Sequence, residues 1–411
     1  MRRLDLFRRA PDYRRLFLAT LTSGVGTYLA AIALTVDVYD RTGSGTWVSA
    51  LLIAEFLPMI LVGLLLGPLV DRLSRRGLMI GSDLVRLVVF CLLPFAGSAT
   101  VVIALAFVAG VATGFFRPAV YAGLPNLVSD DDLPTANSLL QAVENVAWMI
   151  GPVVGGVLIS ASDPDLAYWV NAATFLVSAL LLIRIKAHRL QAVAVESRGH
   201  WQDLGDGLRV VLGSRALLLV LVVWNIVLIG NAAVNVAEIV LAKVSLDAGD
   251  VGFGVLVGAS GLGLTLGSLA ASPLLERFGV RSSYTTSIAL MAAGFGLAAV
   301  APHLVVAVVG VVVGTLGNGA AVVCNALLVQ RGAPDELRGR AFTVIMSSNY
   351  VMLGLGMVAA GPLVDAFGAR WLWGGASVAF LLASLTALAL ARGLEARVAQ
   401  AELEEALPSR V

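Results

Sequence analysis

The chain has 411 residues, of which 58% are hydrophobic and only 13% are charged, and its mean hydropathy is +0.90. Soluble domains average roughly 25% charged and 45–50% apolar residues, so this composition excludes an ordinary soluble protein. The net charge of +1 gives no reason to expect a nucleic-acid partner. We therefore expect an integral membrane protein embedded in a lipid bilayer.

The predicted elements are transmembrane helices, each of which needs about 20 mostly apolar residues. Twelve segments meet this requirement: 16–38, 47–70, 78–97, 99–122, 134–160, 166–186, 216–242, 251–275, 283–301, 303–327, 341–363 and 371–391. The arginine-rich first fifteen residues do not resemble the start of a cleavable signal. The first span is therefore expected to be an uncleaved anchor.

Basic residues are distributed unequally between the two sides of these spans. Of the 28 Lys and Arg, only Arg41, Lys243 and Arg370 fall on the side opposite the N-terminus. Cytoplasmic loops carry the excess of Lys and Arg, so we expect both termini to be cytoplasmic. Lysine is rare while Ala, Gly and Val are abundant, which is typical of a GC-rich bacterial genome. The expected location is a bacterial cytoplasmic membrane.

The longest internal polar stretch divides the spans six and six. We expect a cytoplasmic N-terminus (1–15), a six-helix bundle (16–186), a cytoplasmic linker (187–214), a second six-helix bundle (215–391) and a cytoplasmic tail (392–411). The linker is expected to contain a short amphipathic helix near 201–212. Cys91 and Cys324 lie in apolar runs of different halves, so no disulfide is expected.

The loop between the second and third spans reads Gly-Pro-Leu-Val-Asp-Arg-Leu-Ser-Arg-Arg. It resembles the signature loop of the major facilitator superfamily, and the matching residues are Gly67, Leu69, Asp71, Arg72, Arg75 and Arg76. Ser74 stands where that family usually has glycine. The resemblance implies an all-α integral membrane fold, with twelve transmembrane helices in two pseudo-symmetric six-helix bundles. It also implies that this loop helps to hold the cytoplasmic side closed.

Asp71 ends the second span, where the helix dipole disfavours an anion. We expect this to be offset by Arg72, by Arg75, or by the start of the eleventh span. A second copy of the loop occurs at residues 272–281, where Pro, Leu, the acid and two Arg positions recur. Such a repeat indicates duplicated halves, which is the parallel arrangement of major facilitator transporters.

The fifth span contains the pattern Gly-Pro-x-x-Gly-Gly. Gly151, Pro152, Gly155 and Gly156 resemble the end of the antiporter signature of drug-exporting families, although Ala147 and Ser138 replace its earlier glycines. The segments 116–119, 124–128 and 133–139 are similar to the branch that contains enterobactin exporters and macrolide efflux pumps. The arginine that many antiporters carry early in the fourth span is replaced by Ala106. Packing alone is an alternative role for the glycines.

Charged residues within spans are costly, which makes them candidates for function. Asp83 and Arg86 are three apart, so they can pair on one helix face, and we assign them to the cytoplasmic gate. Three carboxylates are candidates for proton coupling, with Glu144 preferred to Glu55 and Glu238. A static hydrogen-bonded role for Glu144 is the alternative. The candidate substrate-cavity residues are Thr27, Arg117, Gln141, Trp148, Asn225, Asn231, Asn235, Asn318 and Asn325.

These patterns together predict a secondary active transporter rather than an enzyme. We expect proton-coupled efflux of amphipathic small molecules of the drug, macrolide or siderophore type. An uptake or lipid-handling carrier of the same fold is the alternative. An integral-membrane enzyme is disfavoured because the sequence has no nucleophile–base, phosphate-loop or metal-binding motif. We expect no cofactor, no metal site and a monomeric protein, with a small-molecule substrate and protons as its partners.

Overall fold

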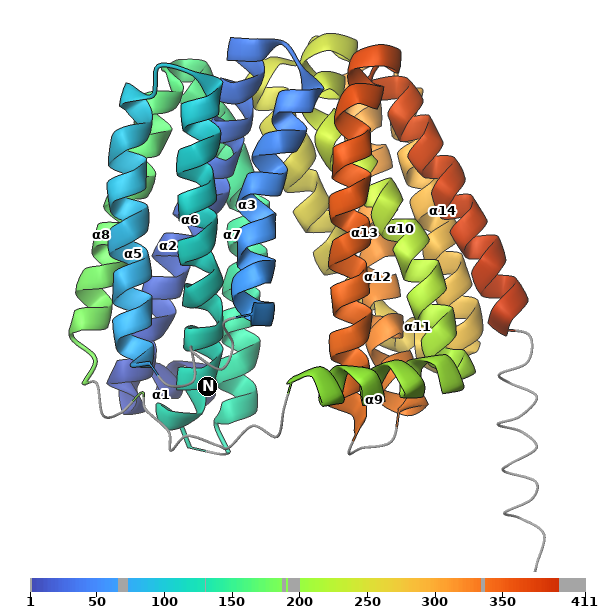
Figure 1. Ribbon diagram of the computed structural model, residues 1–411, viewed down its shortest axis with the longest axis horizontal. Helices are drawn as coiled ribbons and strands as arrows, with labels where there is room; N and C mark the ends of the chain where they lie inside the picture. The colour runs from blue at the N-terminus through green and yellow to red at the C-terminus, as the bar shows by residue number, and fades with distance from the viewer. Residues whose placement is uncertain are drawn as a thin grey trace, which may run out of the picture. The chain divides into compact units, whose positions relative to one another are not determined.

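The computed structural model describes residues 2–65, 73–129, 131–186, 190, 200–333 and 337–391, and the regular structure within them is entirely helical (Figure 1). The first half contains α1 (Arg2–Arg9), α2 (Pro11–Thr42), α3 (Gly45–Leu65), α5 (Arg75–Leu92), η1 (Leu93–Phe95), α6 (Ala99–Gly123), η2 (Leu124–Asn126), α7 (Leu133–Ala161) and α8 (Pro164–Ile183). The second half contains α9 (His200–Gly213), α10 (Arg215–Val240), η4 (Leu241–Ser245), α11 (Gly249–Ala299), α12 (Leu304–Gly332), α13 (Arg338–Phe367) and α14 (Ala369–Ala391).

The helix lengths account for twelve membrane crossings. Ten helices in the described chain are long and apolar enough to span a bilayer, and Gly45–Pro58 forms a shorter apolar helix. The 51 residues of α11 would extend about 76 Å, more than twice a hydrocarbon core of about 30 Å. This helix is interrupted at Gly279, whose φ of 72° lies in the region that favours glycine. The two spans predicted at 251–275 and 283–301 lie on either side of this break, so the prediction of twelve helices is confirmed.

Helix starts follow from local sequence. Ser74 caps α5 by accepting a hydrogen bond from the backbone N–H of Gly77 at 3.2 Å, and Ser98 caps α6 through Val101. Ser74 is the residue that departs from the family pattern, and the cap gives it a structural role. The helix predicted near 201–212 is confirmed by α9.

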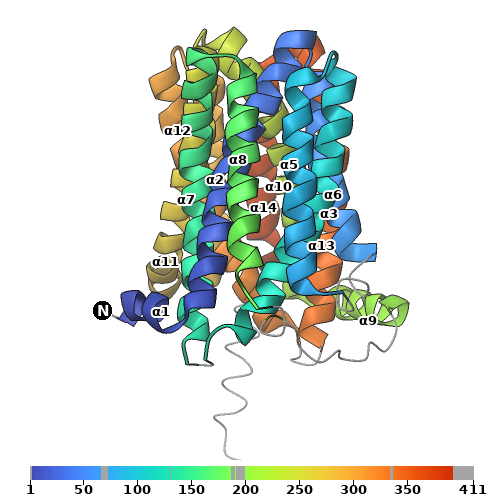
Figure 2. The same ribbon diagram turned by 90° about the vertical axis from the view of Figure 1, so that its left-hand side faces the viewer.

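Packing divides the chain into two units. Unit 1 comprises Met1–Ser197, Val236–Gly261 and Met357–Ala369, and unit 2 comprises Arg198–Asn235, Leu262–Gly356 and Arg370–Val411. In unit 1, α2 packs against α7 and α8, α3 packs against α6, and α5 packs against α6 and α8 (Figure 2). Unit 1 therefore includes, besides the described helices from α1 to α8, one end of each of α10, α11 and α13.

The short helix α1 belongs to the core at one end of unit 1. Its Leu6 is buried with Leu16 of α2, Met79 of α5 and Phe116 of α6. The Tyr13 hydroxyl donates a hydrogen bond to the carbonyl of Ala136 at 3.0 Å, which ties α2 to the start of α7. The N-terminal residues thus anchor the ends of several helices.

Unit 2 is held together by close helix contacts at small residues. Gly294 of α11 lies against the backbone of Gly310 and Gly314 in α12, and no larger residue would fit this approach. Gly230 of α10 packs against the ring of Phe380 in α14. Glycine at these positions therefore allows close helix packing in unit 2.

Candidate functional site

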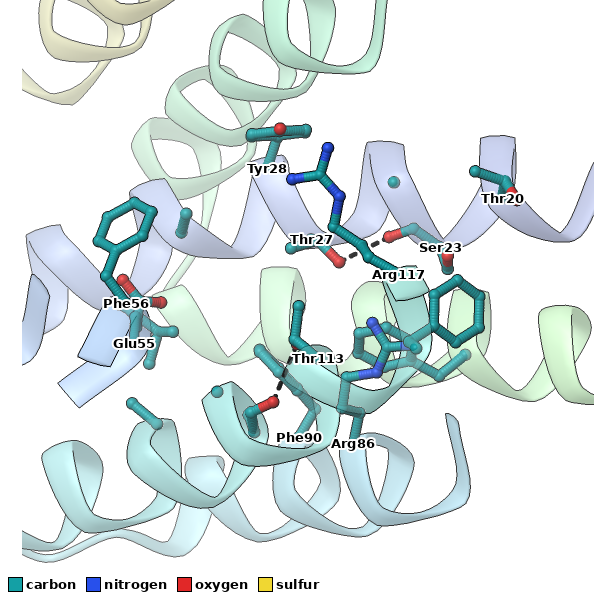
Figure 3. Close-up of a pocket in the computed structure, with 18 of the residues that line it drawn as sticks. Thr20, Ser23, Thr27, Tyr28, Glu55, Phe56, Arg86, Phe90, Thr113 and Arg117 are labelled. Carbon is teal, nitrogen blue, oxygen red and sulfur yellow. Dashed lines mark hydrogen bonds between the residues drawn. The ribbon is translucent and has the colours of Figure 1, made fainter. Parts of the chain in front are cut away.

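Unit 1 contains a cavity of about 220 Å³ inside its helix bundle, lined by residues of α2, α3, α5, α6, α7 and α8 (Figure 3). Its wall is largely apolar and aromatic, with Tyr28, Phe56, Phe90, Phe116 and Phe175 contributing rings. Hydroxyl groups come from Thr20, Ser23, Thr27 and Thr113, and charged groups come from Glu55, Arg86, Arg117 and Glu144. An apolar cavity with a few convergent polar groups is the usual form of a small-molecule site.

An ion pair on the cavity wall joins two helices. The guanidinium of Arg117 in α6 lies 2.7 Å from Oε2 of Glu144 in α7, and the Tyr121 hydroxyl donates to Oε1 at 3.2 Å. The Glu144 side chain is 18% exposed and the Arg117 side chain is 49% exposed, so both remain accessible from the cavity. Figure 3 shows the Arg117 guanidinium extending towards Tyr28 of α2. The pair can therefore exchange a proton or meet a bound molecule.

A second ion pair lies deeper between α5, α6 and α8. Nη2 of Arg86 is 2.6 Å from Oδ1 of Asp83, and both side chains are buried. The Ser178 hydroxyl donates to the other Asp83 oxygen at 2.7 Å. The guanidinium carbon of Arg86 lies 4.5 Å from the centre of the Phe116 ring and 4.4 Å from that of Phe175. The predicted pairing of Asp83 with Arg86 is confirmed, and it is reinforced by two aromatic faces.

The other two candidate carboxylates occupy different surroundings. Glu55 of α3 lines the cavity, next to Phe56 (Figure 3), at the point where its backbone carbonyl approaches Gly110 of α6. Glu238 of α10 is buried, and its Oε1 has no hydrogen-bond partner among the described residues. Glu238 is not among the residues that line the cavity.

The glycines of the Gly-Pro-x-x-Gly-Gly pattern lie in two helix contacts. A Cβ at Gly155 would lie 2.6 Å from the carbonyl oxygen of Leu29, and one at Gly151 would lie 2.7 Å from the Cβ of Tyr28, so both fit α7 against α2. A Cβ at Gly156 would lie 2.6 Å from the carbonyl oxygen of Asp250 in α11. Pro152 lies inside α7. The packing role of these glycines is thus clear, and their part in antiport stays a prediction.

Most of the signature loop lies outside the described residues, including Gly67, Asp71 and Arg72. Its two final arginines are described at the start of α5. Arg75 donates to the carbonyls of Ala122 at 2.7 Å and Leu190 at 3.2 Å. Arg76 donates to the carbonyls of Leu182, at 3.3 Å, and Ile183, at the end of α8. Cations are favoured at helix C-termini, so these contacts stabilise the ends of α6 and α8.

The remaining predicted cavity residues are spread over both units. Thr27 lines the cavity, while its hydroxyl donates to the Ser23 carbonyl of its own helix at 2.7 Å (Figure 3). Gln141 and Trp148 of α7 lie outside the cavity lining. In unit 2, Asn225 donates to the Ser348 hydroxyl at 2.8 Å. Residues Asn231, Asn235, Asn318 and Asn325 lie on α10 and α12, and their role stays a prediction.

Sequence reasoning missed the aromatic part of the site. Tyr121, which shares Glu144 with Arg117, follows that arginine by four residues, so one helix face carries both. That spacing was the sequence signal that could have placed Tyr121 beside Arg117. The rings of Phe56, Phe116 and Phe175 had none, because single aromatic residues within an apolar span are ordinary lipid-facing or core residues.

This chain is similar in sequence and in fold to known proteins. A family model described as "Transmembrane secretion effector" matches residues 7–408. The "Multidrug efflux pump Tap" of Mycolicibacterium fortuitum is 28% identical over 400 residues, covering 94% of this chain and 97% of that protein. Tap of Mycobacterium tuberculosis H37Rv is 26% identical over 384 residues, covering 88% of each chain. The crystal structure of nucleoside transporter NupG superposes with a TM-score of 0.75 at 14% identity, covering 93% of this chain and 99% of that one.

Proposed function

We propose that this chain, which belongs to the transmembrane secretion effector family of major facilitator transporters, exports amphipathic small molecules in exchange for protons. Members of this family and the similar proteins are transporters and not enzymes. The similarity to multidrug efflux pumps extends over almost the whole length of both chains. This supports efflux rather than uptake as the direction of transport.

The observation that carries the proposal is the Arg117–Glu144 ion pair on the wall of an aromatic cavity. A proton-coupled carrier needs a group that is accessible, titratable and coupled to substrate occupancy. Protonation of Glu144 removes its attraction for Arg117, and it leaves a cation free in the cavity. Proton binding therefore changes the charge that a substrate meets.

The charges around the cavity favour a cationic substrate. Asp83 balances Arg86, and Glu144 balances Arg117. Glu55 is then the carboxylate on the cavity wall with no basic partner among the described residues. When Glu55 is ionised the site has a net negative charge of one unit, and a lipophilic cation in the cavity supplies the counter-charge that Glu55 lacks. A proton on Glu144 cancels that charge, so proton and cation compete.

The aromatic rings supply the remaining recognition. Tyr28, Phe56 and Phe90 offer faces that bind flat apolar groups and attract cations. A volume of about 220 Å³ holds one ring system of a drug-sized molecule within this unit. Rings without a dense set of hydrogen-bond donors fit a site that accepts several related substrates.

The transport cycle also needs gates and a direction. We infer that Asp71 and the basic residues after it stabilise the closed cytoplasmic side, and that the Asp83–Arg86 pair supports the same end of the bundle. The distribution of Lys and Arg supports cytoplasmic termini in a bacterial cell membrane. Alternating exposure of the cavity to the two sides then moves substrate outwards and protons inwards.

The proposal is tested with purified protein in liposomes, with the fluorescent lipophilic cation ethidium as the substrate. A pH gradient should drive ethidium transport by the parent protein. Glu144→Gln should abolish gradient-driven transport and leave ethidium binding weaker but detectable, and Glu55→Gln should also weaken the binding of ethidium. Undiminished gradient-driven transport by Glu144→Gln would remove Glu144 from the mechanism.

A further inference from the structure

One carboxylate in unit 1 joins two helices that are far apart in sequence. Oδ1 of Asp365, near the end of α13, accepts from the backbone N–H of Gly45 at 2.6 Å. Its Oδ2 accepts from the Ser44 hydroxyl at 2.7 Å, and from the Thr46 backbone N–H at 3.1 Å and hydroxyl at 2.7 Å. All four donors belong to residues 44–46, at and just before the start of α3. Asp365 therefore caps a helix that lies about 320 residues away.

Such a cap is favourable for two reasons. The first N–H groups of a helix have no partner within the helix, and the positive end of the helix dipole stabilises a carboxylate. Hydrogen bonds to a charged group contribute more than neutral ones. The arrangement holds the start of α3 firmly as long as α13 stays beside it.

The contact continues along α13 at intervals of four residues. Gly361 lies against the backbone of Thr46 and the side chain of Ser49, at distances that leave no room for a Cβ. The Ser49 hydroxyl donates to the backbone carbonyl of Met357. Met357, Gly361 and Asp365 thus form one stripe of α13 along the first turns of α3.

A second ionic link occurs at the same end of unit 1. The Lys243 ammonium lies 2.5 Å from Asp40 at the end of α2 and 2.8 Å from Asp250 at the start of α11. Segments from the second half of the sequence are thereby tied to α2 and α3. By the distribution of basic residues, this end is the extracellular one.

The sequence of the stripe recurs elsewhere in the chain. Residues 361–365 read Gly-Pro-Leu-Val-Asp, and residues 67–71 read the same. The first copy ends the predicted second span and the other ends the eleventh. The second span begins with α3, whose start Asp365 caps, whereas Asp71 is expected to meet the start of the eleventh. In each copy of the repeat, the aspartate at the end of one of these two spans is thus matched to the start of the other span.

We propose that Asp365 is a gating residue that holds the extracellular end of the transport pathway closed. The cap on α3 must break each time α13 and α3 separate, and it re-forms when the outer side shuts. The inference rests on the proposed function for its place in a transport cycle. The closed contact itself can be tested without transport.

The experiment measures how fast a buried cysteine reacts. In a variant with Cys91 and Cys324 replaced by Ala, Ser49→Cys places a thiol inside the contact, where the native side chain is 3% exposed. The labelling rate with a membrane-impermeant maleimide is measured on intact cells. Asp365→Asn and Asp365→Ala should raise this rate about tenfold, which corresponds to about 1.4 kcal/mol of opening free energy.

Matched variants separate the effect of the Asp365 contact from a general disturbance of the fold. Thr46→Val removes one donor and keeps the backbone N–H, so it should raise labelling by about two- to threefold. Asp163→Asn, at an exposed acid just after α7, should leave the rate unchanged. The inference is overturned if neither Asp365 variant raises labelling, or if Asp163→Asn raises it equally. If the Asp365 variants raise labelling but the parent protein shows no transport, the closing role of Asp365 is retained and the export function is refuted.

Discussion

Breaking the buried Asp83–Arg86 pair should destabilise the protein far more than breaking the Arg117–Glu144 pair. Asp83→Asn leaves the Arg86 guanidinium without a counter-ion at a site where both side chains are at most 4% exposed. Removal of one partner from a buried ion pair costs about 3–5 kcal/mol. Because Arg86 keeps the faces of Phe116 and Phe175, we expect a value near the lower limit, about 3 kcal/mol.

Two matched variants, Arg86→Met and Glu144→Gln, should lower the free energy of unfolding by different amounts. Arg86→Met removes the guanidinium and both ring contacts and leaves Asp83 with only the Ser178 hydroxyl. This variant should lower the free energy of unfolding by about 4–5 kcal/mol. Glu144→Gln should cost less than about 1 kcal/mol, because its partner Arg117 is half exposed and can be solvated.

The assay is the free energy of unfolding of purified protein in detergent, obtained by titration with SDS. The double variant Asp83→Asn with Arg86→Met should cost less than the sum of the single changes, since no unpaired charge remains. A loss of less than about 1 kcal/mol for Asp83→Asn, or an equal loss for Glu144→Gln, would refute the view that the buried Asp83–Arg86 pair contributes more to stability than the Arg117–Glu144 pair.

Three further predictions concern the gate, the helix contacts and the orientation. Asp71→Asn should insert normally and lower the transport rate at least about tenfold in liposomes, and a normal rate would refute its gating role. Gly156→Val should reduce transport severely because its side chain meets the backbone of α11, whereas Gly81→Ala, with nothing within 4 Å, should transport at the parental rate. In the variant without native cysteines, Ser98→Cys should react with an impermeant maleimide on intact cells and Ser197→Cys should not; the reverse result would invert the topology.

The number of spans and the local pairs could be predicted because they depend on neighbouring residues. Apolar runs of about 20 residues gave the crossings, and a spacing of three placed Asp83 and Arg86 on one helix face. The break in α11 was also predictable, since Gly279 and nearby arginines interrupt the apolar run. Each of these features can be read within a window of a few turns.

Contacts between helices could not be predicted in this way. Arg117 and Glu144 are 27 residues apart, and nothing in the sequence shows that α6 and α7 bring them within 2.7 Å. Asp365 looks like an acid at the end of a span, where solvation is the ordinary outcome. Its partners follow only from the packing of α13 on α3. The repeated pentapeptide was the one sequence signal for it.

The most direct test of proton-coupled export uses inside-out membrane vesicles that contain the protein. In these vesicles an acidic lumen should drive uptake of ethidium, a protonophore should abolish that uptake, and Glu144→Gln should show none while Asp163→Asn matches the parent. Ethidium uptake by the parent that persists at full rate after the protonophore, or that is the same as in vesicles lacking the protein, would contradict the account.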